Sequence, residues 1–431
     1  MLTSDAVFSH RVAWDRAENP LAVLERARRQ DGAAIIDLTV SNPTSVGLTY
    51  PTALLREALA HPDVGVYEAA PRGLESARAA VAADYASKGI ALAADDLLLT
   101  ASSSESYGLL FKLLCDPGDS VLVPQPSYPL FEYLTTLEGV RTIPYLLSYD
   151  GAWHVDFASV TEALAQAQAV GRPRALIAVS PNNPTGSFTK QGELRRLAGL
   201  CASHDLALIS DEVFADYGFS PGGSASVGVG AGAAGGAARA NLESDAQFVR
   251  CAAASPIASD VLTFSLGGLS KSCGLPQLKL GWVAARGPAD QLRAAWERLE
   301  LIADTTLSVG TPVQLAAARL LTLGGRIREQ IQARVHTNRE TLRSLLPGFP
   351  SLTLLAAEGG WSLILRLPAV ESDETWAKIL LAEDGLLVHP GYLFDMPRGT
   401  FLTISLLPQP ELFARAAERL LRRCAGARES S

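Results

Sequence analysis

The stretch Ser265-Leu-Gly-Gly-Leu-Ser-Lys-Ser-Cys-Gly-Leu-Pro-Gln-Leu-Lys-Leu-Gly-Trp282 is the most informative part of the 431-residue chain. An apolar run at residues 261–264 leads into it and predicts a buried strand. Small residues then surround Lys271, and a second lysine, Lys279, follows eight residues later. Residues 281–285 are apolar again and continue the set of predicted strands.

Earlier apolar runs have the same character, because each ends directly before polar residues. Strands that alternate with helical patterns predict an α/β fold with a mostly parallel sheet, covered by helices on both faces. Ligands bind at the carboxyl ends of such strands, so we expect the polar residues to converge there. The runs span residues 96–100, 121–123, 174–180 and 206–210, and the polar residues after them include Ser103, Ser104, Tyr128, Asn183 and Asp211.

The chain is long enough for two domains. We expect a large domain at residues 46–300 and a smaller α/β domain at residues 301–431. Residues 1–45 are expected to form an arm that packs with the smaller domain. We also expect a helical region at residues 288–346 that is broken at Gly324-Gly325. The Gly- and Ala-rich residues 220–240 are expected to form a flexible insertion, with a functional lid as the less favoured alternative. A helix is expected at residues 241–256.

Composition excludes several classes of protein. A net charge of -8 and a pI near 5.4 argue against a nucleic-acid binder. The sequence has neither a signal-peptide pattern nor an uncharged apolar stretch long enough for a membrane span. Five scattered cysteines without a CxxC pair argue against a disulfide framework or a metal site. We therefore expect a cytoplasmic protein.

Lys271 and Asp211 suggest a reactive amine beside a buried carboxylate. A lysine that attacks a carbonyl must first lose its proton, which requires a lowered pKa. The small, largely neutral residues around Lys271 suit this, although a surface lysine in a glycine-rich loop is the simpler interpretation. Asp211, at the end of a buried strand, could pair with a pyridine nitrogen, and its alternative is a helix cap. Together they suggest a pyridoxal phosphate site in which Lys271 forms the Schiff base.

The sequence also predicts a phosphate-binding site. Phosphates bind to hydroxyls, backbone N–H groups and cations. Ser103 and Ser104 precede a predicted helix and could supply the first two, although a helix cap is the simpler interpretation. Ser270 could add a hydroxyl and Lys279 a cation. Tyr128 could stack on a flat ring, or it could be a core aromatic.

Across residues 35–425 the chain resembles the class I/II aminotransferases, fold-type I pyridoxal-phosphate enzymes. Seven motifs occur in that family's order, which is far more specific than any one of them. They are Tyr67 with Gly73, Ser103-Ser104, Tyr128, Asn183 in Asn-Pro-Thr-Gly, Asp211, Ser270-Lys271 and Lys279.

The resemblance implies a role for each motif. Lys271 would carry the cofactor and shuttle the proton, Asp211 would pair with the ring nitrogen, and Asn183 would bind the phenolic oxygen. Tyr128 would stack on the ring. The phosphate would be held by Ser103, Ser104, Ser270 and Lys279, with Tyr67 supplied by a second copy of the chain. A homodimer with shared active sites is therefore implied.

Three positions depart from the family pattern. Phe214 stands where a tyrosine usually contacts the phenolic oxygen, and Lys279 stands where arginine is usual. Thr403 occupies the place of the arginine that normally clamps the substrate carboxylate. Arg398 or Arg366 could substitute, although both are more simply surface residues; Asn42 is a further candidate for contacting the substrate.

The resulting expectation is an aminotransferase that transfers an amino group between a small-molecule donor and an oxo acceptor. Because Phe214 and Thr403 depart from the pattern, elimination, decarboxylation or ring formation on the same scaffold is the alternative. A regulatory module without catalysis is disfavoured, since no helix-turn-helix or basic extension precedes residue 35.

Overall fold

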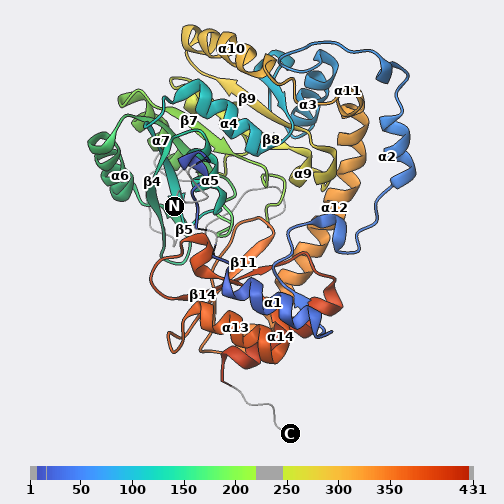
Figure 1. The fold of residues 1–431 in the computed structure, drawn as a ribbon, viewed down its shortest axis with the longest axis vertical. Coiled ribbons are helices and arrows are strands. Elements are labelled where there is room, and N and C mark those ends of the chain that lie inside the picture. The colour runs from blue at the N-terminus through green and yellow to red at the C-terminus, as the bar shows by residue number, and fades with distance from the viewer. Residues whose placement is uncertain (1–6, 16, 220–245, 427–431) are drawn as a thin grey trace, which may run out of the picture.

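The computed structural model describes residues 7–15, 17–219 and 246–426. They form two parts, a larger one built on an eight-stranded sheet and a smaller one built on a four-stranded sheet (Figure 1). The predicted insertion at residues 220–240 lies outside the described residues. Among the described residues, no helix combines the length and apolar character that a bilayer crossing requires.

The large sheet is mostly parallel, as predicted. Six of its strands run in one direction, and only β9 and β5 oppose them. The apolar runs all became strands, whereas β4 and β5 had not been predicted. In spatial order the strands are β2 (Leu97–Thr100), β9 (Gly281–Arg286), β8 (Thr263–Gly268), β7 (Ala207–Asp211), β6 (Pro173–Val179), β3 (Ser120–Gln125), β4 (Arg141–Tyr149) and β5 (Trp153–Val155).

Helices cover both faces of this sheet. Successive residues of a strand point to opposite sides of the sheet, so each strand contributes side chains to the apolar packing on both faces. Leu176 and Leu208 pack in one apolar cluster, and their neighbours Ile177 and Ile209 pack in another. The first cluster includes α6 (Phe157–Val170) and α7 (Gln191–Ser203). The second includes α4 (Ser103–Leu114), α5 (Leu130–Leu137) and α10 (Ala289–Asp304).

The small sheet is antiparallel, and its strand order is β10-β11-β14-β13. The N-terminal segment joins this part, since β1 pairs with β12 and α1 packs against α13. The domain bounds themselves stay predictions. The elements are α1 (Pro20–Gln30), β1 (Ile36–Asp37), β10 (Thr353–Leu354), β11 (Ser362–Leu367), α13 (Asp373–Asp384), β12 (Leu386–Leu387), β13 (His389–Pro390), β14 (Thr400–Ser405) and α14 (Pro410–Cys424).

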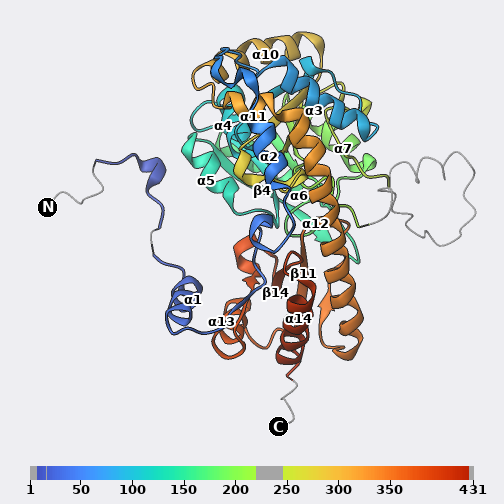
Figure 2. The same cartoon turned by 90° about the vertical axis from the view of Figure 1, so that its right-hand side faces the viewer.

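A long helix, α12 (Ala317–Leu345), runs along both parts of the molecule (Figure 2). The predicted break at Gly324-Gly325 is wrong, because both glycines lie inside α12. A side chain at Gly324 would collide with Cys273, so this glycine allows α12 to approach the lysine segment closely. The helical region is instead interrupted at residues 305–310, between α10 and the short α11 (Thr311–Leu315).

The helix predicted at residues 241–256 is also wrong where it can be compared, since residues 246–255 form turns and irregular chain. The remaining helices are short or lie at the outer edge of the large part. They are α2 (Thr52–Leu59), α3 (Glu75–Ser87), α9 (Leu269–Ser272) and the 3₁₀ turns η1 (His10–Val12), η2 (Pro43–Ser45), η3 (Pro62–Gly65), η4 (Ala94–Asp96), η6 (Pro256–Ala258), η7 (Pro276–Leu278), η8 (Leu346–Gly348) and η9 (Gly391–Phe394).

Asn338 provides a test of how α12 is joined to the small sheet. This fully buried side chain donates to the carbonyls of Leu406 and Pro408, at 2.8 and 2.7 Å, just beyond β14. Because Asn338→Ala leaves both carbonyls without a donor, we expect the free energy of unfolding to fall by about 2–3 kcal/mol. The measurement is urea unfolding followed by circular dichroism. Thr337→Ala, an exposed neighbour on the same helix, should change stability by less than about 0.5 kcal/mol.

Candidate active site

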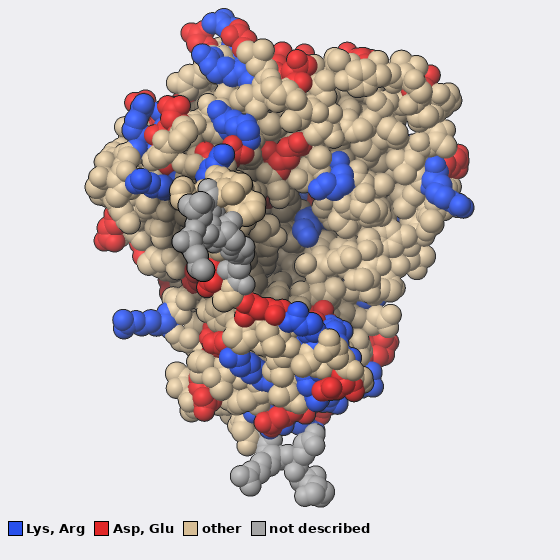
Figure 3. Space-filling view, viewed as in Figure 1, with Lys and Arg blue, Asp and Glu red and all other residues tan. Residues whose placement is uncertain are grey.

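The predicted polar residues follow strands that share one direction, so they gather at one edge of the large sheet. This edge faces the small sheet, and the space-filling view has a hollow between the two parts at this level (Figure 3). Side chains from both parts meet here. We call Lys271, Asp211, Phe214 and Trp361 the Lys271 cluster.

Lys271 lies in the four-residue helix α9, directly after β8. Its Nζ is 5.7 Å from the ring centre of Phe214 and 5.3 Å from that of Trp361. Burial lowers the pKa of Lys271, and the nearby Asp211 carboxylate partly opposes this shift. The lowered pKa enlarges the neutral fraction of the amine, which is the form that attacks a carbonyl.

Asp211 is the last residue of β7 and is buried. The Tyr107 hydroxyl donates to its Oδ2 at 3.0 Å, and the Val213 N–H donates to its Oδ1 at 3.2 Å. Burial raises the pKa of Asp211, and these two hydrogen bonds and Lys271 oppose the rise. Burial also raises the pKa of Tyr107 well above its usual value, so its hydroxyl remains a donor.

Ser103, Ser104, Ser270 and Lys279 are brought together by strand pairing. β9 lies between β2 and β8, with Gly281 opposite Thr100 on one side and Gly268 on the other. Lys279, two residues before Gly281, therefore lies between the chain that enters α4 and the chain that enters α9. Ser103 and Ser104 are the first residues of α4 rather than residues that precede it, so the free N–H groups of α4 add to the hydroxyls.

The Asn-Pro-Thr-Gly turn lies beside the loop that carries Tyr128. Asn182, which the sequence had not singled out, donates to the Pro126 carbonyl at 2.8 Å and accepts from Ser127 Oγ at 3.1 Å. Asn183 is half-buried next to it. The pKa of Tyr128 is raised by burial and by the charge of the Asp211 carboxylate.

Trp361 is the residue of the Lys271 cluster that sequence patterns missed. It precedes β11 in the small part, yet its ring packs edge-on against Phe214 and Tyr217 at 5.2 and 5.0 Å. Its signal in the sequence is the pair of glycines before it: Gly359 allows a close backbone approach, and Gly360 takes a positive φ of 91°. The small sheet therefore supplies one wall of the site.

Thr403 lies in β14, and its hydroxyl is buried without a hydrogen-bond partner among the described residues. The same face of β14 carries Phe401, which packs with residues of the large sheet, and Ser405, whose hydroxyl donates to the Val40 carbonyl at 2.6 Å. Thr403 therefore faces the large part of the molecule rather than the helices behind β14.

The proposed substitutes for the missing arginine lie elsewhere. Arg398 is exposed in the turn before β14, and Arg366 is exposed beside Thr353, 3.5 Å from its hydroxyl. Neither contacts the Lys271 cluster within the described structure. Asn42 caps η2, where its Oδ1 accepts from the backbone N–H and the hydroxyl of Thr44 at 3.0 and 2.7 Å.

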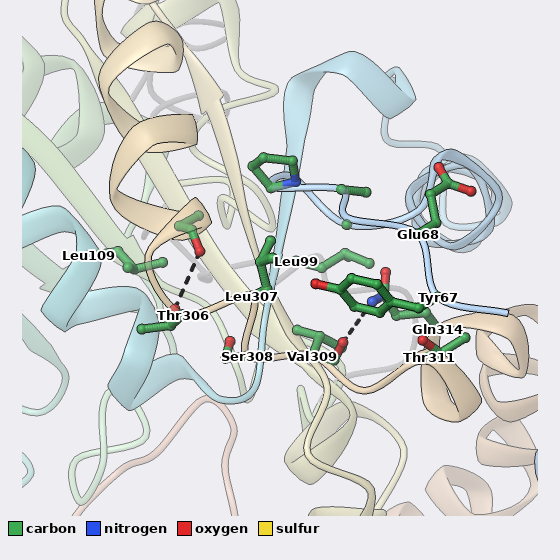
Figure 4. A pocket seen from close by; sticks show the side chains of 14 residues that line it. Tyr67, Glu68, Leu99, Leu109, Thr306, Leu307, Ser308, Val309, Thr311 and Gln314 are labelled. Carbon is green, nitrogen blue, oxygen red and sulfur yellow. Dashed lines mark hydrogen bonds between the residues drawn. The ribbon is translucent and has the colours of Figure 1, made fainter. Parts of the chain in front are cut away.

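Tyr67 lies against a different cavity. It is 72% exposed, and Figure 4 shows its ring facing the chain that joins α10 to α11, near Leu307 and Val309. Its assignment to the active site of a second copy stays a prediction. As for metals, residues 7–15, 17–219 and 246–426 contain no group of three or more His, Cys, Asp or Glu placed to hold an ion.

Comparison with known proteins gives consistent results. The model of the family "Aminotransferase class I and II" matches residues 34–420. The alanine aminotransferase of Mycobacterium tuberculosis is 27% identical, covering 90% of this chain and 85% of its own. The glutamate-pyruvate aminotransferase AlaA of Haemophilus influenzae is 26% identical, with 91% of both chains covered. The alanine aminotransferase of Pyrococcus furiosus shares the fold, with a TM-score of 0.80 at 21% identity over 98% of this chain and 100% of its own.

Glu212 points away from Asp211, as expected for neighbours in an extended chain. Its Oε1 accepts from the Ala252 N–H at 2.7 Å and from Ser265 Oγ at 2.9 Å, and its buried Oε2 has no partner among the described residues. Burial raises the pKa of Glu212 to about 8, although these donors oppose the rise. The carboxyl is therefore protonated in the folded protein at neutral pH.

This protonation predicts a pH-dependent stability. The unfolded chain releases the Glu212 proton near pH ~4.3, whereas the folded chain keeps it up to about pH 8. Between these values the free energy of unfolding should fall with rising pH, on the order of 1.4 kcal/mol per pH unit from this group alone. Glu212→Gln keeps the shape of the side chain and cannot ionise. Measured by urea unfolding, the free energy of unfolding of the variant should therefore rise relative to that of the wild type as the pH increases across this window.

Glu340→Gln is the matched control, because Glu340 is exposed on α12. Its stability difference from the wild type should stay nearly constant over the same pH range. Parallel pH profiles for the wild type and Glu212→Gln would show that Glu212 is ionised in the folded protein.

Proposed function

Because the chain belongs to the class I and II aminotransferase family, we propose that it uses pyridoxal phosphate, held by Lys271, to move an amino group between a small-molecule amino donor and an oxo acceptor. The observation that carries this assignment is the half-buried Lys271 amine beside the buried Asp211 carboxylate, at the edge of the sheet where the other predicted residues gather. Membership of this family makes the chain a transferase, and the roles of its individual residues are proposed.

The residues at the edge fit this cofactor. Asp211 is a buried carboxylate whose hydrogen-bond donors, Tyr107 and Val213, are uncharged, so a protonated ring nitrogen would provide the cation that it lacks. Lys279 with the start of α4 suits a phosphate dianion. When bound, pyridoxal phosphate supplies a ring that accepts electrons from the substrate.

Each residue then has a distinct task. Lys271 would hold the cofactor covalently, and its Nζ would carry the proton that is moved. Asp211 would keep the ring nitrogen protonated, and Asn183 would bind the phenolic oxygen. Tyr128 would lie against the ring. The phosphate would be held by Ser103, Ser104, Ser270 and Lys279.

The substrate side of the site favours a small or apolar donor. The walls that surround the Lys271 amine are the rings of Phe214 and Trp361. The relatives named as alanine and glutamate-pyruvate aminotransferases make alanine, glutamate and their oxo acids the first compounds to test. Elimination, decarboxylation or ring formation remains the second candidate, because Thr403 offers a hydroxyl where a guanidinium would clamp a carboxylate.

Assembly and location belong to the same proposal. We infer a homodimer in which Tyr67 reaches the phosphate of the neighbouring copy, since this tyrosine is 72% exposed and lies away from the Lys271 cluster of its own chain. We also infer a cytoplasmic enzyme, on the basis of the scattered free cysteines.

Lys271→Ala is the direct test of the site. We expect the variant to lose the visible absorbance of the bound cofactor and at least about three orders of magnitude in kcat, because no other amine replaces the nucleophile. The measurements are the absorbance spectrum of the purified protein and amino transfer from a panel of donors. Lys112→Ala, which removes an exposed lysine paired with Glu138, should keep both properties.

A single-turnover experiment separates the two candidate reactions. An aminotransferase converts its bound cofactor to the amine form when a donor alone is added, and the visible band disappears. Release of ammonia or carbon dioxide, with the band retained for every donor, would identify the second candidate instead. A colourless wild-type protein would contradict the cofactor assignment.

Thr403→Val tests whether the substrate meets β14. The buried hydroxyl has no hydrogen-bond partner in the described part of the chain, so its removal should change the free energy of unfolding by less than about 1 kcal/mol. If the hydroxyl binds the donor, KM should rise about three- to tenfold with a smaller change in kcat. Thr142→Val, at the amino end of β4 and thus at the opposite edge of the sheet, should leave KM unchanged. An unchanged KM in Thr403→Val would exclude this contact.

A further inference from the structure

The backbone of Lys271 is held by a residue that no sequence motif identified. α9 is only four residues long, so its carbonyls have few partners within the helix. The Tyr217 hydroxyl donates to the Lys271 carbonyl at 2.6 Å. The Gly274 N–H donates to the same oxygen at 3.2 Å. Tyr217 thus closes the end of the helix that presents the reactive amine.

Tyr217 is suited to a fixed position. It is 2% exposed, and burial raises its pKa well above the usual value, so the hydroxyl remains a donor over the working pH range. The preceding residue, Asp216, accepts from Lys88 Nζ at 2.9 Å and from an Arg328 Nη at 3.1 Å. Gln332 on α12 donates to the Asp216 carbonyl at 2.7 Å. These contacts hold the backbone next to Tyr217 against α12 and against Lys88, the residue that follows α3.

Tyr217 also contacts the segment of the small part that carries Trp361. Its carbonyl accepts from the Gly360 N–H at 2.9 Å, and Gly218 forms a bridge with Gly359. Its ring centre is 5.0 Å from that of Trp361, whose own ring lies 5.3 Å from the Lys271 amine. One residue therefore touches both the backbone of Lys271 and the wall that faces its side chain.

From this geometry we propose that Tyr217 is a positioning residue that ties Lys271 to the small sheet, so that the reactive amine and the Trp361 wall keep a fixed relation. The proposal rests on the function proposed for Lys271. Tyr217 does not replace the tyrosine that the family pattern would place at Phe214, because its hydroxyl is engaged by a backbone carbonyl. It acts through the lysine rather than on the substrate.

Tyr217→Phe removes the hydroxyl and keeps the ring against Trp361. When Lys271 is held less firmly, water reaches its nitrogen more easily and stabilises the protonated form, so the midpoint pH of the cofactor's visible absorbance change in the holoenzyme should rise by about half a pH unit. We expect kcat to fall about tenfold while KM for the donor changes less than about twofold, since only orientation is lost.

Tyr145→Phe is the matched control. Tyr145 is buried as deeply, and its hydroxyl donates to the Ile177 carbonyl at 2.8 Å, in the middle of the large sheet. Both variants lose one buried hydroxyl-to-carbonyl bond and should lose similar thermal stability. Only Tyr217→Phe should shift the absorbance midpoint. Equal midpoints in the two variants and the wild type would reduce Tyr217 to a structural residue and overturn the proposal.

Gly359→Ala tests the same link from the other side. A Cβ at residue 359 would lie 2.6 Å from the Tyr217 carbonyl oxygen, so the two segments must move apart. The midpoint should shift in the same direction as in Tyr217→Phe, and an unshifted midpoint would contradict the link. A wild-type protein without any visible band would contradict the proposed function; a normal wild-type band with unshifted variants would contradict this inference alone.

Discussion

The burial of charged groups at the carboxyl edge of the large sheet is the constraint on which the site depends. Burial raises the pKa of Asp211 and lowers that of Lys271, so each group is displaced toward its neutral form. Their mutual attraction and the Tyr107 hydroxyl offset part of this cost. A cationic ring nitrogen would remove the imbalance at Asp211 and leave the lysine amine free to react. The folded chain thus holds a buried carboxylate, Asp211, that favours a positively charged group of a ligand.

Two sheets are needed to create this place. The large sheet delivers Asp211 and Lys271 from adjacent parallel strands, β7 and β8, but leaves the amine open on one side. The small sheet closes that side with Trp361, and Gly359 allows the two backbones to come close enough for Tyr217 to bridge them. Gly324 serves a similar purpose on α12, where it makes room for Cys273 beside the lysine segment. Close approaches at glycine therefore contribute to the geometry of the site together with the Tyr217 hydrogen bond.

The sequence predicted those features that local patterns determine. Apolar runs followed by polar residues identified the parallel strands and their carboxyl ends, and with them Asp211 and Lys271. The prediction from sequence is wrong where long-range packing determines the structure. A glycine such as Gly324 gives the same local signal whether it ends a helix or makes room for a neighbouring segment. Tyr107, Asn182, Tyr217 and Trp361 were missed for the same reason, since each acquires its role only from a partner distant in the chain.

The aromatic rings beside the Lys271 amine limit which part of a substrate can bind there. A carboxylate brought next to the Phe214 and Trp361 rings would lose water without gaining a charged partner, unless a cation from another copy of the chain supplied one. A donor with an apolar group at that position would lose nothing, and it would gain contact with two aromatic faces. The Thr403 hydroxyl, which has no hydrogen-bond partner among the residues that the structure describes, can compensate one polar atom but cannot neutralise a charge. The Phe214 and Trp361 rings therefore favour the apolar end of the donor on this side, and the charged end must bind at another part of the site.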